Sequence, residues 1–213
     1  MRKYKVYLVG GYAYSDYLNW VLPLGFEITQ DLKQSDLVFF CGGHDINPTI
    51  YGHEIHPTTN YSAERDLEEK SIFNKAVSLK KKLWGCCRGA QAICAYQKGG
   101  YLIQHSNHPS FHEGITENGE KLMLTSSHHQ MAAPFNLNHK ILVYTEKLSD
   151  FHYLGNGTDI NIEKEPEIVF YGDVFGVGSQ SHVEWQFGLE DSESKKTVKY
   201  HQETLSKLMS NSL

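Results

Sequence analysis

The sequence predicts an α/β protein with an open, mostly parallel central sheet flanked by helices. Short apolar runs at 4–9 and 36–41 end in glycine pairs, as buried parallel strands do when helices cover both faces. A third such run, at 82–86, passes directly into a helical run at 88–100. Strands that alternate with helices and end in glycines indicate an open α/β sheet.

Two further helical predictions come from the first half of the chain. Residues 16–30 predict a short helix that breaks near Pro23 and Gly25. From Ser62 to about Lys80, apolar residues recur at helical spacing. Acidic residues come early in this run and lysines come late, which suits the helix dipole.

The second half of the chain reads as strands followed by a closing helix. Strands are predicted at 121–125 and 140–145, and a hairpin over 167–182 leads to a final strand. An amphipathic helix is predicted from Ser192 onwards. No repeat, low-complexity linker or boundary interrupts the chain, so residues 1–213 are expected to form a single domain.

Composition excludes several functional classes. The net charge of −5 is not that of a protein that binds nucleic acid or an anionic membrane. No apolar stretch reaches the roughly 18–20 residues that a membrane span needs. The four cysteines form no C-x-x-C pair and no zinc-type spacing, so reduced thiols and a cytoplasmic location are expected.

Two adjacent cysteines stand at the junction of the strand at 82–86 and the helix that follows it. Cys87 lies at the sharp turn, with Gly85 and Gly89 two residues away on either side. Small neighbours permit a strained turn that projects a nucleophile, and the helix N-terminus favours its thiolate. Cys86 lies one residue earlier, points the other way and should be packed. An alternative remains open at this stage, that both are small core residues.

A thiolate nucleophile needs a histidine, and the histidine needs an orienting acid. The histidines number twelve, and only the segment GSQSHVEW presents one in a favourable setting. There His182 and Glu184 stand two residues apart, and in a strand they would face the same side. An exposed pair on an edge strand is the alternative if these two are considered alone.

Several segments, taken together and in order, resemble the motifs of one family. They are FFCGGHDINPTIYG (39–52), ERDLEE (64–69), GCCRGAQ (85–91), GGYLIQH (99–105), SSHHQ (126–130) and GSQSHVE (178–184). This set resembles the γ-glutamyl hydrolase branch, the peptidase C26-like group, of the class I glutamine amidotransferase-like superfamily. Members similar to γ-glutamyl-GABA hydrolases cleave γ-glutamyl amides.

The resemblance implies a flavodoxin-like fold and a Cys-His-Glu triad. Cys87 would be the nucleophile, His182 the base and later the acid, and Glu184 the residue that orients the imidazole. The reaction would hydrolyse the γ-glutamyl amide of a small compound through a γ-glutamyl thioester. Backbone N–H groups of Gly43 and Arg88 would form the oxyanion hole.

The resemblance also implies a substrate pocket lined by Gln91, His128, His129 and Gln130, and it requires no cofactor. A metal cluster is conceivable from HSNHPSFHEG (105–114) together with SSHHQ (126–130), but no metal is expected, because the spacing suits no familiar ligand set and the family needs no metal. The alternative function is a glutaminase subunit that supplies ammonia to a separate synthetase partner. A homodimer is a further possible assembly. A binding protein with an inactive fold is disfavoured by the intact triad.

The chain departs from the family pattern in places that shape specificity. Val183 replaces the usual proline between the histidine and the glutamate, and Ser181 replaces a large residue. The regions before the first glycine pair and after Gln130 are short, which puts the leaving group in doubt. Four aromatic residues are expected at the pocket rim: Tyr12, Tyr14, Tyr17 and Trp20.

Overall fold

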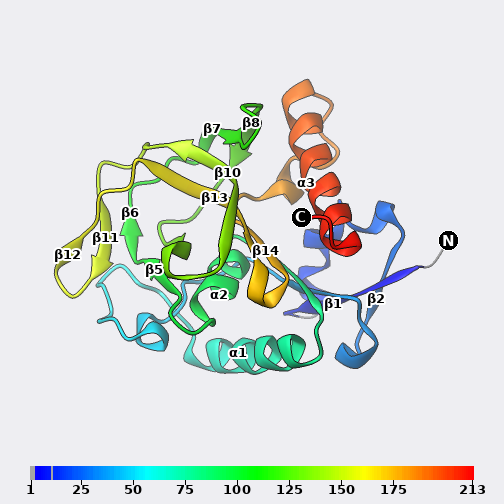
Figure 1. Cartoon of the computed structure of the whole chain (residues 1–213), viewed down its shortest axis with the longest axis horizontal. Coiled ribbons are helices and arrows are strands. Elements are labelled where there is room, and N and C mark those ends of the chain that lie inside the picture. The colour runs from blue at the N-terminus through cyan, green and yellow to red at the C-terminus, as the bar shows by residue number, and fades with distance from the viewer. Residues whose placement is uncertain (1–2, 11) are drawn as a thin grey trace.

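The computed structural model describes residues 3–10 and 12–213, without the side chains of Tyr12 and Ala13. These residues are arranged around a nine-stranded sheet (Figure 1). The order is β2 (Phe26–Thr29), β1 (Tyr4–Val9), β3 (Leu37–Phe40), β4 (Lys82–Cys86), β14 (Gly176–Ser179), β13 (Lys164–Tyr171), β10 (His139–Glu146), β7 (Phe111–Thr116) and β8 (Lys121–Thr125). From β2 to β14 the strands are parallel, and from β13 to β8 they continue antiparallel. The predicted open α/β class is confirmed.

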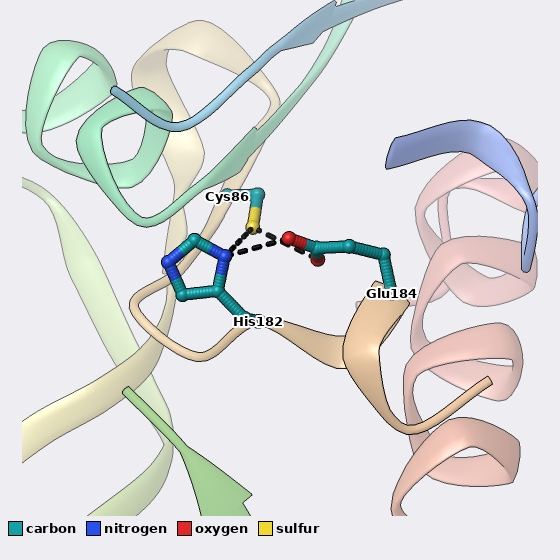
Figure 2. A group of neighbouring side chains, drawn as sticks. All are labelled: Cys86, His182 and Glu184. Atoms are coloured by element: carbon teal, nitrogen blue, oxygen red, sulfur yellow. Dashed lines mark hydrogen bonds and ion pairs between the residues drawn. The ribbon is translucent and has the colours of Figure 1, made fainter. Parts of the chain in front are cut away.

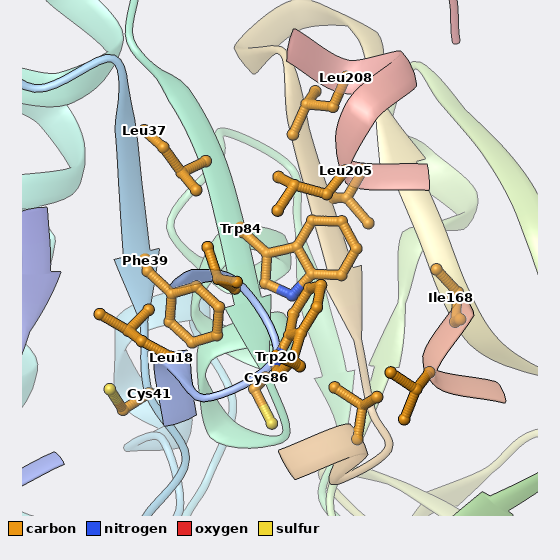
Figure 3. Packing of buried hydrophobic residues seen from close by; sticks show 14 of the residues in the cluster. Leu18, Trp20, Leu37, Phe39, Cys41, Trp84, Cys86, Ile168, Leu205 and Leu208 are labelled. Atoms are coloured by element: carbon orange, nitrogen blue, oxygen red, sulfur yellow. The ribbon is translucent and has the colours of Figure 1, made fainter. Parts of the chain in front are cut away.

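Helices cover both faces of this sheet. The helices α1 (Ala63–Ser78) and α2 (Arg88–Ala95) pack on one face, and α3 (Ser192–Ser210) packs on the other. Because strand side chains alternate, Phe39 joins the core beneath α3 while Phe40 joins the core beneath α1 and α2. Figure 3 shows Trp84 of β4 packed between Phe39 and Leu205 of α3. The site-bearing strand β4 is therefore enclosed on both faces.

Two of the predicted helices form where the sequence places them. Ser62 caps α1 by accepting a hydrogen bond from the backbone N–H of Arg65, and Asp191 caps α3 through Ser194. At its C-terminal end, α3 finishes at Asn211 in a left-handed conformation.

The prediction for residues 16–30 is wrong. This segment holds two short 3₁₀ helices, η1 (Tyr12–Leu18) and η2 (Leu22–Leu24), followed by the edge strand β2. Pro23 falls in the first turn of η2, and Gly25 ends it at φ 87°. β2 pairs with β1, and Leu18, Trp20 and Val21 join the core beneath α3 without forming a regular helix.

The predicted strands of the second half are confirmed as β8, β10 and the β13–β14 hairpin. The histidine-rich region also forms two small sheets that sequence patterns did not reveal. They comprise β5 (Tyr101–Ile103) with β9 (Met131–Ala133), and β6 (His105–Ser106) with β11 (His152–Gly155) and β12 (Thr158–Asp159). The remaining 3₁₀ helices are η3 (Leu32–Gln34), η4 (Pro48–Tyr51), η5 (Pro134–Asn136), η6 (Gly172–Val174) and η7 (Val183–Trp185). Within the described residues, no helix has the length and apolar character that crossing a membrane requires.

A glycine-to-alanine change on α2 tests how tightly this helix meets the sheet. A Cβ at Gly89 would lie 2.0 Å from the carbonyl oxygen of Phe40, and backbone atoms cannot yield to it. We expect Gly89→Ala to lower the free energy of unfolding by about 2–4 kcal/mol in urea titrations. The exposed helical change Asn74→Ala is the control, expected within about 0.5 kcal/mol of wild type. A Gly89→Ala protein as stable as this control would contradict the packing.

Candidate functional site

The turn between β4 and α2 consists of a single residue. β4 ends at Cys86 and α2 begins at Arg88, so Cys87 lies between them, with φ 50° and ψ −112°. Non-glycine residues adopt this conformation only where the surrounding structure enforces it, as at a nucleophile turn. A Cβ at Gly85 would lie 2.3 Å from the backbone of Gly89, so two glycines allow the strand and helix to close around Cys87.

His182 reaches the same place from the neighbouring strand. It follows β14, which pairs in parallel with β4, and it precedes the 3₁₀ helix η7. Its Nδ1 donates to Oε1 of Glu184 at 2.6 Å, as Figure 2 shows. The strand predicted through this pair is wrong, because β14 ends at Ser179 and the contact is made across a turn. The spacing of His182 and Glu184 therefore predicted their contact correctly, although the strand expected there does not form.

His182 lines the same pocket as Cys87 and Ser127. Ser127 Oγ lies 3.1 Å from Nε2. Burial lowers the pKa of His182, whereas hydrogen bonds with Cys87 and Glu184 raise it, and the net result is a pKa of about 9. An imidazole held between a sulfur and a carboxylate in this way remains protonated at neutral pH, which stabilises a thiolate beside it.

Cys86 lies on the other side of the imidazole from the pocket. Its thiol is 3.4 Å from Oε2 of Glu184 (Figure 2). It is also 3.3 Å from the carbonyl oxygen of Ser181. Burial, first of all, raises the pKa of this thiol well above its usual range, so the S–H is retained as a donor. Cys86 is buried as expected, but its partners are polar groups of the site and not only apolar neighbours.

A pocket of about 250 Å³ opens over Cys87. It is lined by Tyr17, Gly43, Asp45, Cys87, Gln91, Ser127, His128, His129, His182 and Trp185. The structure therefore brings most of the predicted site residues to one cavity. Glu184 stands behind His182, and Arg88 contributes its backbone at the start of α2.

The predicted substrate residues occupy different positions around this pocket. Gln91 donates to the carbonyl oxygen of Gln130 at 2.8 Å, which fixes it in the wall. The Gln130 side chain is wholly buried and bonds both the N–H and the C=O of Ile46, at 3.0 and 3.2 Å. It therefore braces the wall and does not line the pocket. His129 lies 3.0 Å from Asp45, and in the described chain both ring nitrogens of His128 lack a partner.

Three pocket residues were not singled out from the sequence. Asp45 and Ser127 stand inside the matched motifs, and that position was the available signal. Trp185 stacks on the ring of His182, with centroids 3.9 Å apart and planes inclined by 3°. Its side chain covers one face of the imidazole, which no local pattern predicts.

The aromatic rim predicted from the N-terminal segment is only partly correct. Tyr17 lines the pocket, while Tyr14 packs near Tyr17 and the guanidinium of Arg65. Trp20 is fully buried in the core beneath α3, so the prediction is wrong for this residue. The side chain of Tyr12 lies outside the described structure.

A buried ion-pair network supports the glycine loop opposite Cys87. The guanidinium of Arg88, 1% exposed, pairs with Asp66 at 2.6 Å and with Glu69. Arg65 pairs with Glu69 at 2.7 Å and donates to the carbonyl oxygen of Gly42 at 2.9 Å. In a trans peptide the C=O and N–H point in opposite directions. The N–H of the following residue in the loop therefore points away from Arg65.

Solved structures share this architecture. A glutamine amidotransferase from Thermotoga maritima matches with a TM-score of 0.59 at 13% identity, covering 98% of this chain and 96% of its own. PurLQS from the same organism matches with a TM-score of 0.59 at 16% identity, covering 97% and 100%. The chain has the fold of the class I glutamine amidotransferases.

The family is shown by sequence. The model of Peptidase C26 matches residues 19–161, and the chain belongs to the Peptidase C26 family. NtpR of Enterococcus hirae is 25% identical over 152 residues, 65% of this chain and 59% of NtpR. A Schizosaccharomyces pombe protein provisionally named a glutamine amidotransferase, PB2B2.05, is 28% identical over 178 residues, 80% of this chain and 62% of its own. The chain spans about three-fifths of the length of these two relatives.

The titration of His182 predicts how stability depends on pH. Its pKa is about 9 in the folded chain against 6.5 ordinarily, so the stabilisation is complete below pH 6.5 and is lost as the pH rises through 9. Urea unfolding of the wild type and of His182→Gln, at about pH 6 and about pH 9.5, measures this effect. We expect the wild type to lose about 1–3 kcal/mol more than the variant over this range. Equal losses would contradict the raised pKa.

Proposed function

We propose that this protein hydrolyses the γ-glutamyl amide bond of a small γ-glutamyl compound, with Cys87 as nucleophile. The observation that carries the proposal is the strained residue Cys87, which lines the same pocket as His182, while His182 is itself oriented by Glu184. This is the arrangement of an activated nucleophile, its base and an orienting acid. Membership of the Peptidase C26 family supports cysteine-dependent hydrolysis of this type.

The first half of the reaction forms a thioester. The Cys87 thiolate attacks the γ-carbonyl carbon, and the carbonyl oxygen becomes an oxyanion. The backbone N–H groups of Gly43 and Arg88 would stabilise it; the Arg65 bond to the preceding carbonyl supports the required orientation of the Gly43 N–H. His182 then gives its Nε2 proton to the leaving nitrogen, the C–N bond breaks and the amine departs.

The second half hydrolyses the thioester. Neutral His182 takes a proton from water through Nε2, and the hydroxide formed attacks the thioester carbon. The C–S bond breaks, glutamate is released, and the thiolate beside protonated His182 is restored. Glu184 accepts from Nδ1–H in both halves, so the same imidazole edge faces the substrate each time.

The pocket supports a small substrate with a charged end. A volume of about 250 Å³ is below the range of most drug-sized ligand pockets. Among the lining residues, Asp45 is the carboxylate that reaches the cavity, and it would pair with the α-ammonium of the glutamyl group. Neutral His128 lines the cavity and would bind a polar group of the substrate through one ring nitrogen.

A glutaminase subunit that supplies ammonia to a synthetase is the second candidate. The similarity to PurLQS favours it at the level of fold. The two candidates share the same chemistry and differ in what activates it. Hydrolysis of γ-glutamyl amines by the isolated chain supports the first, and glutamine turnover that appears only with a synthetase present supports the second.

Replacing the predicted nucleophile tests the proposed chemistry directly. The wild type, incubated with glutamine and a panel of γ-glutamyl amines, is expected to release glutamate. Cys87→Ala should lower kcat/KM by about 10³-fold or more, because no thioester forms without the sulfur. An electrophilic, thiol-directed glutamine analogue should label Cys87 in mass spectrometry. Labelling of Cys86 instead would overturn the assignment, as would undiminished turnover by Cys87→Ala.

The neighbouring cysteine has a different predicted role. Its S–H donates to the second oxygen of Glu184, so we propose that Cys86 positions the acid. Cys86→Val removes this donor and should lower kcat about 5–30-fold at unchanged KM. Cys86→Ser keeps a donor at the same position and should restore most of the rate. Equal rates for the two variants would show that Cys86 only fills space.

A further inference from the structure

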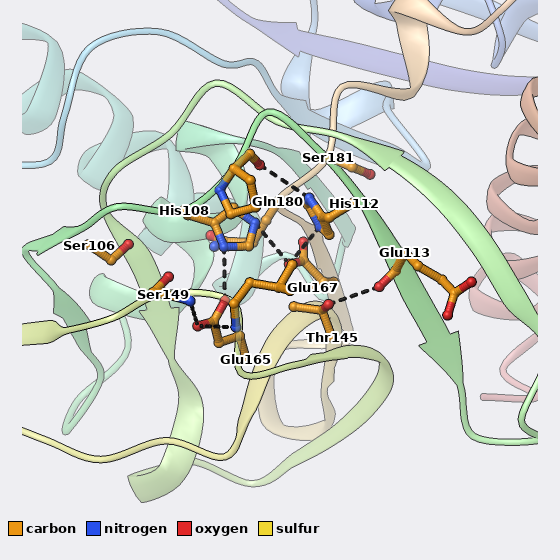
Figure 4. A network of polar contacts seen from close by, with 12 residues as sticks. Ser106, His108, His112, Glu113, Thr145, Ser149, Glu165, Glu167, Gln180 and Ser181 are labelled. Atoms are coloured by element: carbon orange, nitrogen blue, oxygen red, sulfur yellow. Dashed lines mark hydrogen bonds and ion pairs between the residues drawn. The ribbon is translucent and has the colours of Figure 1, made fainter.

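A second polar cluster is buried behind the pocket wall. Figure 4 shows His108, which precedes β7, and His112 of β7 converging on Glu165 and Glu167 of β13. Both glutamate side chains are 0% exposed, as is that of His108. His128, which lines the pocket, stacks on the ring of His108 and closes the cluster on that side.

Potential ligand atoms in this cluster lack hydrogen-bond partners. His108 Nε2 lies 3.3 Å from Glu167 Oε1 without forming a hydrogen bond, whereas His112 Nε2 is hydrogen-bonded to the same oxygen at 3.1 Å. Within the described residues, Glu167 Oε2 and both ring nitrogens of the buried His128 also lack partners. Ligand atoms of His108, His128 and Glu167 lie within 4.8 Å of one another. Leaving so many buried polar atoms unsatisfied is costly unless something binds them.

The outer hydrogen bonds resemble those behind metal-binding histidines. The Nδ1 of His108 lies 2.9 Å from Glu165 Oε2, and that of His112 lies 3.2 Å from the carbonyl oxygen of Pro109. Carboxylates and carbonyls in these positions fix the ring so that Nε2 is left for a metal ion. Glu165 is itself held by the backbone N–H of Ser149 at 2.8 Å.

The two buried carboxylates of the cluster need a balancing positive charge. Glu165 and Glu167 bring two negative charges into a fully enclosed space. In residues 3–10 and 12–213, the ion pairs of these two carboxylates are with histidines, and no lysine or arginine joins them. Either histidines are protonated, or a divalent cation balances both carboxylates while the imidazoles stay neutral.

We propose that His108, His112, His128 and Glu167 bind a zinc ion, with Glu165 as the carboxylate behind His108. Imidazole nitrogens and carboxylate oxygens are both zinc ligands, and three imidazoles with one carboxylate would complete a four-coordinate site. The ring of His128 is stacked on that of His108, with the planes inclined by 18°. The His128 ring would therefore rotate to bring one of its nitrogens to the ion. The ion would join β7, β13 and the loop that carries His128, which stiffens the pocket wall.

The inference departs from the sequence-based expectation of no metal, and it does not depend on the proposed function. A ligand set spread over three segments has no recognisable spacing. Only the pairing of β13 with β10, and of β10 with β7, brings these segments together.

Metal analysis of protein made without a polyhistidine tag tests the proposal. We expect close to one zinc per chain by mass spectrometry after dialysis against zinc and then buffer. Removal by a chelator should lower the Tm by roughly 5–10 °C, and zinc should restore it. Cobalt(II) in place of zinc should give the visible absorption of a tetrahedral site. If the chain binds no zinc, and neither the chelator nor added zinc changes its Tm, the proposal is overturned.

Substitutions of single residues test where in the chain the zinc ion binds. Glu167→Gln and His112→Gln should lose zinc and the cobalt spectrum, whereas Glu113→Gln, an exposed change next to His112 on β7, should keep both. The second described group with suitable ligand atoms is Cys86, His182 and Glu184. Zinc lost from Glu184→Gln but kept by Glu167→Gln would place the ion there and overturn the proposal. Should Glu167→Gln fail to fold, His112→Gln and the cobalt spectrum still decide.

Discussion

The buried ion-pair network around Arg88 is the interaction on which the rest of the site depends. Arg88 is the first residue of α2, and its side chain is held by two carboxylates of α1. Through Arg65 the same network reaches the carbonyl oxygen of Gly42. One set of charges therefore sets the positions of both backbone segments proposed to stabilise the oxyanion. Removing one member would leave a buried charge unpaired, a change that usually costs several kcal/mol.

The second constraint is the close approach of β4 to α2. Gly85 and Gly89 allow the backbones of β4 and α2 to come into contact at the turn. Cys87 is the residue of this turn that faces the pocket, and its backbone is strained. The same turn sends Cys86 behind the imidazole, to the second oxygen of Glu184. Two adjacent sulfurs thus have different surroundings, because one lies at the N-terminus of α2 and the other lies beside the carboxylate of Glu184.

Sequence reasoning succeeded where a signal is local and failed where it is not. The strands at β1, β3 and β4 and the helices α1 and α3 follow from apolar periodicity and caps. The helix predicted over residues 16–30 was wrong, because the apolar spacing there suits either a helix or a strand at the edge of a sheet. Gln130 matched a motif, yet its side chain braces Ile46. A motif identifies a position, but hydrogen bonds decide whether its side chain reaches the cavity.

By itself, the sequence determined the fold class, the family and the segments that carry the proposed triad, because these depend on spacing along the chain. Only the tertiary structure decided which segments meet. Strand order places β14 beside β4, so that His182 comes next to Cys87, and it brings the histidines near β7 onto the glutamates of β13. The stacking of Trp185 was decided in the same way. Contacts between distant segments arise from sheet pairing and packing, and neither is encoded at any single position.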